Sequence, residues 1–415
     1  MERLLIEGGR RLQGKVSIDG AKNAALPACV ASLLTDDPLV LHRIPDLRDV
    51  ATALLTVSSL GKHVTRQGWT VKIARQGPLG EVPDSRYVEQ MRASFLVLGP
   101  LLARLGHAVV PLPGGCTIGR RPVDFHLQGL QAMGARVEEG TDAVALRAER
   151  LRGAEIELPY PSVGATEHLI MTATLAQGET VIRNPAKEPE ITDLISLLLK
   201  MGAQIRVEQD AIRVHGTGRL HGAEHTIIPD RLEAGTYLLA GAMTGGEVTV
   251  HGVVPAHLRS FLDVLRETHL EFSAGEDSIT LICAPRPEPV HVVTAPHPGY
   301  PTDLQPPLVA FLSLCRGESR VEERVFERRF DYVPALNRMG AEIEVAGSTA
   351  VIRGVTDLDA AVVAAPDIRA GAALVLAGLA ARGQTTVYQM EKIERGYSGM
   401  DEKLRSLGAQ VERVA

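Results

Sequence analysis

A glycine recurs along the chain after each predicted helix and before the strand that follows, at a spacing of about 70 residues. Successive copies lie 73, 68, 138 and 68 residues apart, and the step of 138 contains a degenerate copy, Thr268-His269-Leu270. A chain of 415 residues therefore holds about six units of one kind. These glycines are Gly61, Gly134, Gly202, Gly340 and Gly408.

A second set of glycines recurs in phase with the first. Each ends a helix rich in alanine or leucine and precedes a short strand, which is a normal stop signal for a helix. Two sets in one phase argue against a chance recurrence of Gly-Ala pairs. We predict that each unit is strand, helix, strand, helix and a hairpin, such as residues 205–207 with 211–214. The second set is Gly106, Gly178, Gly246, Gly317 and Gly383.

Three units of this size make one compact domain, so the sequence predicts two α/β domains of three units each. Pro229 breaks regular structure near the midpoint. The last unit is one strand short, and we expect the opening strand, Leu4–Ile6, to complete it. One domain would hold residues 1–20 and 230–415, and the other residues 21–229. Two crossings between them form a hinge, and a cleft between hinged domains is a natural ligand site.

Composition narrows the possible functions. Hydrophobic content of 45% and a net charge of −6, without a basic block, fit a globular protein that does not bind nucleic acid. No apolar run approaches the length of a membrane span, and the amino terminus does not resemble a signal peptide. The cysteines are scattered and form no metal motif, so we expect a reduced, cytoplasmic enzyme without a metal or cofactor. The oligomeric state is left open.

The segment Pro111–Asp124 contains the strongest candidate for chemistry. Gly114 and Gly115 allow unusual backbone angles, so Cys116 is expected on a loop and not in a core. Arg120 and Arg121 follow closely, and nearby positive charge lowers the pKa of a thiol. We interpret Cys116 as a reactive thiol. The alternative is an ordinary small apolar residue, as most free cysteines are.

Charged residues lie at corresponding places in the units, where helices are predicted to begin. Helix amino termini carry free N–H groups and a partial positive charge, and arginine binds phosphate and carboxylate with two hydrogen bonds. Together they indicate a small, strongly anionic ligand, although each arginine taken singly is better explained as a solvated or ion-paired surface residue. The cations are Lys22, Arg92, Arg121, Arg369 and Arg395.

Asp303 follows Pro301 and Thr302 at one of these helix starts. A carboxylate among arginines can accept a proton from a hydroxyl once a ligand closes the site. The alternative is a helix N-cap. His126 and His168 stand alone in the sequence and are interpreted as structural, with lining of the site as a weaker option. The basic segment 324–330 reads as the edge of a strand or loop, from which Arg329 points toward the site.

These motifs, in this order, resemble the UDP-N-acetylglucosamine 1-carboxyvinyltransferase family of enolpyruvyl transferases, and the resemblance spans nearly the whole chain. It implies two inside-out α/β domains, each of three βαβαββ repeats, joined by a double-crossover hinge. The motifs are Lys22-Asn23, the loop 114–119, Arg121–Asp124, Ser162–Thr166, Pro301–Asp303, Asp367–Gly371 and Arg395–Tyr397.

The resemblance implies transfer of enolpyruvate from phosphoenolpyruvate to the 3′-hydroxyl of UDP-N-acetylglucosamine, by addition and then elimination of phosphate. Cys116 would protonate the methylene carbon and form an adduct with the antibiotic fosfomycin, and Asp303 would be the base. Binding of phosphoenolpyruvate would fall to Lys22, Arg121 and Arg395, with support from Arg92 and Arg369. The nucleotide sugar would meet Asn23, Arg121, Pro122, Val123, Asp124, Phe125, Ser162, Val163, Gly164 and Val325.

Two other functions are compatible with parts of this pattern. The first is enolpyruvyl transfer to shikimate 3-phosphate, but that enzyme lacks the Gly-Gly-Cys loop and has a different lysine-containing helix start. The second is a paralogue that binds the nucleotide sugar for regulation without turnover. The presence of Lys22, Cys116, Asp303 and Arg395 together favours the catalytic reading.

Overall fold

The computed structural model describes residues 2–112, 123–139, 143–282 and 286–414. The described chain folds into two compact units. Unit 1 contains residues 2–19 and 229–414, and unit 2 contains residues 20–112 and 123–228. The chain passes from one unit to the other after Asp19 and again after Ile228. Cys116, Arg121 and Pro122 lie outside the described residues.

Unit 2 contains three small sheets, one for each predicted repeat, with strand orders β13-β3-β5-β4, β6-β8-β7 and β11-β12-β10-β9. Its strands are β3 (Leu39–His42), β4 (Lys62–Gln67), β5 (Thr70–Arg75), β6 (His107–Pro111), β7 (Arg136–Glu139), β8 (Ala143–Arg147), β9 (Glu155–Glu157), β10 (Glu179–Arg183), β11 (Gln204–Val207), β12 (Ala211–His215) and β13 (Glu224–Thr226). Its helices are α1 (Lys22–Ala31), η1 (Ser32–Leu34), α2 (Arg48–Ser59), α3 (Ser85–Val88), η2 (Arg92–Val97), α4 (Leu98–Leu105), α5 (Asp124–Ala132), α6 (Val163–Ala173) and α7 (Pro189–Lys200).

Unit 1 repeats this plan with sheets β15-β16-β14-β2, β17-β18-β20-β19 and β21-β22-β1-β23. Its strands are β1 (Arg3–Glu7), β2 (Gln13–Ser17), β14 (Glu247–His251), β15 (Glu271–Ala274), β16 (Ser278–Ile282), β17 (His291–Val293), β18 (Glu318–Glu322), β19 (Glu342–Ala346), β20 (Thr349–Arg353), β21 (Val362–Ala364), β22 (Gln384–Tyr388) and β23 (Gln410–Val414). Its helices are α8 (Arg231–Met243), η3 (Pro255–Leu258), α9 (Arg259–Glu267), η4 (Thr302–Leu304), α10 (Gln305–Leu312), α11 (Val333–Arg338), α12 (Ile368–Ala380), α13 (Met390–Ile393) and α14 (Met400–Ser406).

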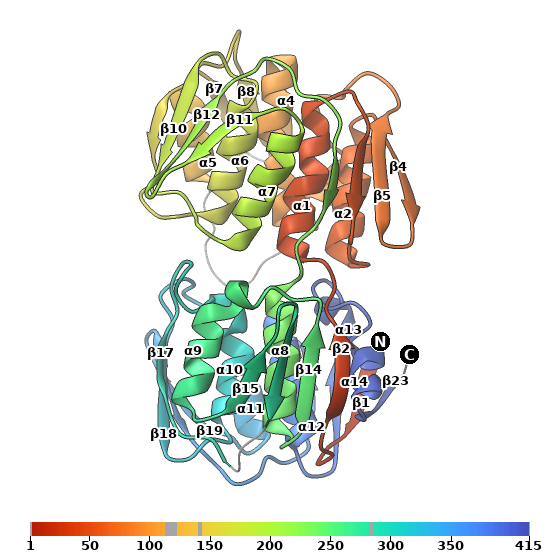
Figure 1. Cartoon of the computed structure of the whole chain (residues 1–415), viewed down its shortest axis with the longest axis vertical. Coiled ribbons are helices and arrows are strands. Elements are labelled where there is room, and N and C mark those ends of the chain that lie inside the picture. The colour runs from red at the N-terminus through yellow and green to blue at the C-terminus, as the bar shows by residue number, and fades with distance from the viewer. Residues whose placement is uncertain (1, 113–122, 140–142, 283–285, 415) are drawn as a thin grey trace. The chain divides into compact units, whose positions relative to one another are not determined.

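Helices lie inside each unit and sheets lie around them (Figure 1). In unit 1, α8, α10 and α12 pack against one another, and every residue of α8 and α10 is buried. In unit 2, α6 packs against α4, α5 and α7. These central helices are rich in alanine, leucine and glycine, whose small or unbranched side chains allow helices to approach closely on all sides. The α/β fold class and its inside-out arrangement are confirmed.

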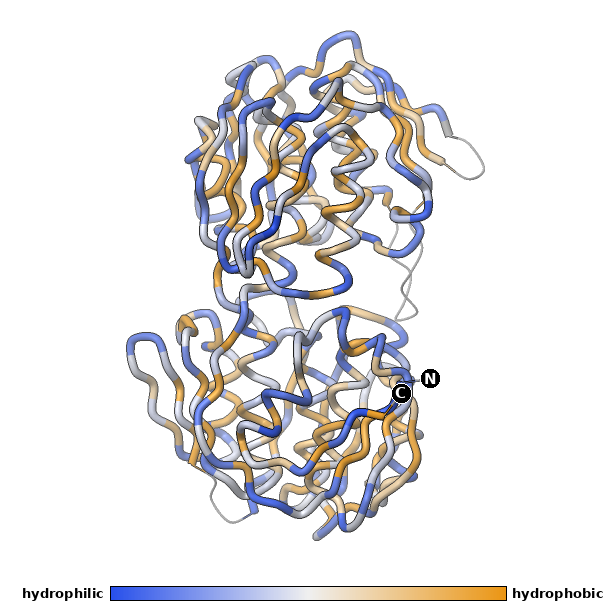
Figure 2. Tube along the Cα trace, turned by 90° about the vertical axis from the view of Figure 1, so that its right-hand side faces the viewer, coloured by the Kyte–Doolittle hydropathy of each residue, from blue (hydrophilic) through white to orange (hydrophobic). Residues whose placement is uncertain are grey.

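The sheets show the alternation expected of strands with one covered face. Buried residues occupy every second position of β1, β6 and β8. Figure 2 shows that hydrophobic and hydrophilic residues both occur along the strands of each unit. The predicted hairpin is confirmed, because β11 and β12 pair antiparallel with Ile205 opposite Val214. In the described part of the chain, no helix is long and apolar enough to cross a membrane.

The first strand of the chain belongs to the last sheet. β1 pairs antiparallel with β22 on one side and with β23 on the other, so that Leu4 lies opposite both Val387 and Arg413. The predicted return of the amino-terminal strand is therefore confirmed. The next strand, β2, pairs parallel with β14. Unit 1 thus needs both ends of the described chain to complete two of its sheets.

The recurring glycines share one backbone conformation. All five members of the first set have φ between +87° and +96°, a region that residues with a Cβ rarely adopt. Each therefore ends its helix and turns the chain toward the hairpin. In the degenerate copy, His269 adopts φ +60° in the same place, so the geometry is kept where the glycine is lost.

Candidate active site

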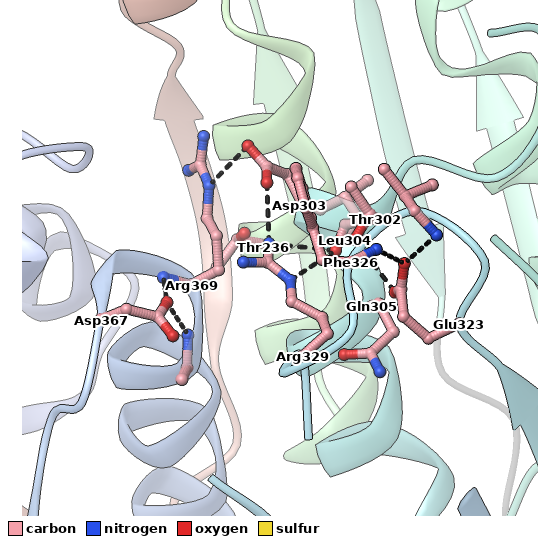
Figure 3. Close-up of polar contacts among 12 residues, drawn as sticks. Thr236, Thr302, Asp303, Leu304, Gln305, Glu323, Phe326, Arg329, Asp367 and Arg369 are labelled. Atoms are coloured by element: carbon pink, nitrogen blue, oxygen red, sulfur yellow. Dashed lines mark hydrogen bonds and ion pairs between the residues drawn. The ribbon is translucent and has the colours of Figure 1, made fainter. Parts of the chain in front are cut away.

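Two clusters of predicted residues lie one in each unit. In unit 1 the Asp303 carboxylate accepts hydrogen bonds from two guanidinium groups (Figure 3). Arg329 Nη2 lies 2.7 Å from Oδ1, and Arg369 Nε lies 3.3 Å from Oδ2. The side chains of Arg329 and Arg369 are almost fully buried, whereas that of Asp303 is 28% exposed. We call these three residues the Asp303 cluster.

The backbone around Asp303 explains why its side chain is available for these contacts. Neither η4 nor α10 has a side-chain N-cap, so the N-cap interpretation of Asp303 is wrong. Arg329 also donates from Nε and Nη2 to the carbonyl oxygen of Thr302, at 3.2 and 3.1 Å. The guanidinium group thus fixes the backbone and the carboxylate of the same turn.

Arg369 lies at the beginning of α12, where Asp367 is the N-cap and accepts from the backbone N–H groups of Arg369 and Ala370. Its Nη1 and Nη2 atoms are buried and have no hydrogen-bond partner among the described residues. Burial disfavours the charge, but Tyr397, Asp303 and Asp230 outweigh it and raise the pKa of Arg369 above its ordinary value. A buried, charged guanidinium with unused donors is suited to an anion.

Arg395 belongs to the turn between α13 and α14 and is partly buried. The next residue, Gly396, packs on the start of α12, since a Cβ at this position would lie 2.5 Å from Ile368 Cγ2 and 3.6 Å from Arg369 Nη1. Tyr397 then places its ring 5.1 Å from the Arg369 guanidinium carbon. The structure therefore brings the segment 395–397 beside the Asp303 cluster.

Sequence reasoning missed Glu323, which organises the loop after β18. Its Oε1 accepts from the backbone N–H groups of Val325 and Phe326, and its Oε2 accepts from the Thr302 hydroxyl at 3.0 Å. Glu323 is buried, and it ties Val325 to the turn that carries Asp303. A buried acid next to a basic segment was the available signal, but the sequence does not reveal its partners.

In unit 2, Lys22 is the first residue of α1 and Asn23 follows it. Lys22 Nζ lies 3.3 Å from Asp49 Oδ2 in the first turn of α2, and both side chains are almost buried. A cation at a helix amino terminus is unfavourable, so Asp49 compensates for the position of Lys22. Arg92 begins η2 and is partly buried.

Two further helix starts in unit 2 contain predicted residues. Val123, Asp124 and Phe125 form the start of α5, and Ser162, Val163 and Gly164 form the start of α6. Ser162 is an N-cap whose hydroxyl accepts from the Ala165 N–H at 3.4 Å. These two starts come together, because a Cβ on Gly164 would lie 3.4 Å from Cε1 of His126, which follows Phe125.

His126 and His168 are the second feature that sequence reasoning missed. Their Nδ1 atoms lie 2.9 Å apart although 42 residues separate them, so they form one pair and are not isolated. Burial, His168 and Arg92 lower the pKa of His126 well below its ordinary value, and burial lowers that of His168 to about 3. No group of residues suited to a metal ion occurs in the described ranges.

Comparison with known proteins agrees with this architecture. A family model described as EPSP synthase (3-phosphoshikimate 1-carboxyvinyltransferase) matches residues 6–404. The crystal structure of the enolpyruvyl transferase NikO from Streptomyces tendae has a TM-score of 0.91 at 25% identity, covering 100% of this chain and 99% of that one. EPSP synthase from Acinetobacter baumannii shares the fold, with a TM-score of 0.79 at 17% identity over 100% of both chains. The fold and the cationic helix starts thus define a protein of the enolpyruvyl transferase class.

Two curated relatives narrow this class. UDP-N-acetylglucosamine 1-carboxyvinyltransferase 1 of Symbiobacterium thermophilum is 47% identical over 100% of this chain and 95% of its own length. The UDP-N-acetylglucosamine 1-carboxyvinyltransferase of Finegoldia magna is 46% identical over 100% of this chain and 99% of its own length. The chain belongs to the UDP-N-acetylglucosamine 1-carboxyvinyltransferase family.

Proposed function

We propose that this enzyme transfers enolpyruvate from phosphoenolpyruvate to the 3′-hydroxyl of UDP-N-acetylglucosamine and releases phosphate, in the cytoplasm, as the first committed step of peptidoglycan synthesis. The observation that carries the proposal is full-length identity of 46–47% to relatives that bear this activity in their names. The related activity on shikimate 3-phosphate belongs to a protein that is only 17% identical.

The reaction needs one acid and one base. In the addition step, the 3′-oxygen bonds to C2 of phosphoenolpyruvate, its proton passes to Asp303, and Cys116 gives a proton to C3. In the elimination step, the bond from C2 to the phosphate oxygen breaks, and C3 returns a proton to the Cys116 thiolate, which restores the double bond and the thiol. The phosphate leaves with the proton that Asp303 took from the hydroxyl. No cofactor enters this balance, because phosphate is the leaving group.

The geometry of the Asp303 cluster supports the assignment of the base. Arg329 and Arg369 donate to different oxygens of the carboxylate and so hold its plane in one orientation. Its partial exposure leaves room for a hydroxyl. Both arginines are buried and hydrogen-bonded to the carboxylate, so they orient it before substrate arrives.

The cations are proposed to bind the donor substrate. Phosphoenolpyruvate carries phosphate and carboxylate groups, for which Lys22, Arg121 and Arg395 are the proposed partners, with Arg92 and Arg369 in support. The unused buried donors of Arg369 fit this role. The uridine end of the acceptor is assigned to Arg121, Pro122, Val123, Asp124 and Phe125, the diphosphate to Ser162, Val163 and Gly164, and the sugar to Asn23 and Val325.

An assay of phosphate release tests the proposal. Purified enzyme is mixed with phosphoenolpyruvate alone, with UDP-N-acetylglucosamine alone, and with both. Release of phosphate only when both substrates are present supports the transferase activity. Release with shikimate 3-phosphate in place of the nucleotide sugar would favour the related activity, and binding of the nucleotide sugar without any release would favour a regulatory paralogue.

A further inference from the structure

The hydrogen bond between His126 and His168 can run in only one direction. The backbone N–H of Gly99, near the start of α4, donates to His168 Nε2 at 2.6 Å, so this nitrogen carries a lone pair. A neutral His168 then has its proton on Nδ1, which donates to His126 Nδ1 at 2.9 Å. His126 Nδ1 must therefore be an acceptor, and the His126 proton lies on Nε2.

Close packing enforces this direction. A Cβ on Gly99 would lie 2.0 Å from Thr172 Oγ1 and 2.6 Å from His168 Nε2, so only glycine allows His168 to reach the backbone N–H. The ring of Phe95 meets those of His126 and His168 edge-on, with centroids 5.5 and 6.0 Å away. Protonation of His126 would put a second proton between the two Nδ1 atoms. Protonation of His168 would put a proton on Nε2, facing the Gly99 N–H. Both are unfavourable, which agrees with the lowered pKa of both histidines.

The hydrogen bonds from Gly99 through His168 to His126 leave the N–H group of His126 Nε2 beside the start of α6. His126 is 7% exposed, and Nε2 has no hydrogen-bond partner among the described residues. A Cβ on Gly164 would lie 3.5 Å from Nε2, so the glycine leaves this edge of the ring accessible. This N–H group can therefore donate a hydrogen bond to an oxygen of a ligand at the start of α6.

We propose that His126 Nε2–H is a binding donor for the diphosphate of the nucleotide sugar at the start of α6, held in this tautomer by His168 and the Gly99 N–H. The inference rests on the proposed function, since it names a further residue of the acceptor site. The start of α6 offers free backbone N–H groups and a partial positive charge, both suited to phosphate oxygens. To these groups the histidine pair adds one uncharged N–H donor, at His126 Nε2, which keeps its direction over a wide range of pH.

Calorimetry with matched variants tests the role of the donor. His126→Phe keeps a ring of similar size and removes the N–H, whereas His126→Gln keeps a donor near the position of Nε2. We expect His126→Phe to weaken binding of UDP-N-acetylglucosamine and of UDP by about 10- to 100-fold, with uridine affinity within about threefold of wild type. His126→Gln should restore the two phosphate ligands to within about fivefold. His63→Phe replaces an exposed histidine of β4 and should change nothing.

Nitrogen NMR of the unaltered enzyme provides an independent test. Spectra of ¹⁵N-histidine report which ring nitrogen carries the proton. We expect His126 and His168 to be protonated on Nε2 and Nδ1, respectively, and the His126 Nε2 signal to shift on addition of UDP but not of uridine. A proton on His126 Nδ1, or equal loss of uridine and UDP affinity in His126→Phe, overturns the proposal, and the NMR result decides alone if the variant does not fold. Failure of wild-type enzyme to bind UDP-N-acetylglucosamine would instead refute the proposed function.

Discussion

Asp303 accepts from two buried guanidinium groups at once and still presents part of its carboxylate to solvent. In the proposed function, Arg329 and Arg369 orient the carboxylate, and the carboxylate itself takes the proton of the hydroxyl. A change that keeps the shape and hydrogen bonds but removes the basicity should therefore act on chemistry and not on binding.

We predict that Asp303→Asn lowers the turnover number by at least about 100-fold, since general base catalysis contributes about 10²–10⁴-fold. The affinity for UDP-N-acetylglucosamine should remain within about fivefold of wild type. Phosphate release and calorimetry provide the two measurements. Asp331→Asn, in the exposed ion pair with Arg328, is the control and should leave both unchanged. A variant with full turnover would exclude Asp303 as the base.

Cys116 has a clear chemical test, although it lies outside the described residues. A carboxylic acid can replace a thiol as proton donor, but a carboxylate is a much weaker nucleophile toward an epoxide than a thiolate. We therefore predict that Cys116→Ser loses most turnover and that Cys116→Asp retains it, while neither variant is labelled by fosfomycin. Mass spectrometry after incubation with the drug measures labelling. An inactive Cys116→Asp variant would contradict the role of proton donor.

The histidine pair gives stability a defined dependence on pH. The folded pKa of both residues lies below the unfolded value of 6.5, so the unfolded chain binds more protons as the pH falls. The contribution of the pair is full above pH 6.5 and is lost progressively toward the folded pKa of His168, about 3. We predict a loss of about 2 kcal/mol from His168 between pH 7 and pH 5, with a further loss in the same direction from His126. Urea unfolding at both pH values measures the free energy of unfolding. The double variant His126→Gln, His168→Gln should lose this part of its pH dependence.

At the level of the secondary-structure elements, the repeated turn from helix to hairpin sets the architecture. Five glycines with φ near +90° perform this turn in five units, and His269 performs it in the sixth at φ +60°. A residue with a Cβ costs about 1–2 kcal/mol in the left-handed region. Glycine costs more chain entropy on folding, which offsets part of that difference.

We predict that His269→Gly raises the free energy of unfolding by about 0.5–1 kcal/mol, because it removes backbone strain from an exposed position with no side-chain packing to lose. Gly340→Ala, at φ +87° in the corresponding turn, should lower it by about 1–2 kcal/mol. Gly77→Ala is the control, since a Cβ there would meet nothing within 4 Å and φ is not positive. Equal effects of all three changes would show that the left-handed turn carries no cost.

These elements also show what sequence can and cannot predict. The glycine spacing predicts the repeated units because a positive φ is a local requirement that one residue type satisfies. The return of β1 follows from counting strands, because an unpaired edge in a sheet must be filled. The contact of His126 with His168 is set by helix packing, and the bonds of Glu323 depend on two loops meeting. No pattern in the sequence records such contacts.

For the whole molecule, the division into two units has a consequence for folding. The described residues of unit 2 all lie between Gly20 and Ile228, whereas unit 1 takes β1 and β2 from the amino-terminal part of the chain. We predict that a fragment of residues 20–228 folds alone, because it contains all strands of its three sheets. A fragment of residues 229–415 should not, because β22, β23 and β14 would each lose a partner.

Circular dichroism and cooperative urea unfolding distinguish these outcomes. Addition of a peptide of residues 1–19 to the second fragment should restore cooperative unfolding, and a peptide with Leu4→Asp and Ile6→Asp should not, since both side chains are fully buried in unit 1. Cooperative folding of residues 229–415 without any peptide would contradict the assignment of β1 and β2 as necessary strands.

The pairing of β1 with β23 also bears on how the protein is made. On the ribosome, Leu4 leaves the exit tunnel long before its partner Arg413 is translated. At 5–20 residues per second the interval is about 20–80 s. During that time unit 2 can complete its fold, while the nascent β1 segment, with Leu4, Leu5 and Ile6, remains an unpaired apolar strand. Such a segment is a natural binding site for a chaperone, and its protection until translation ends would set the yield of active enzyme.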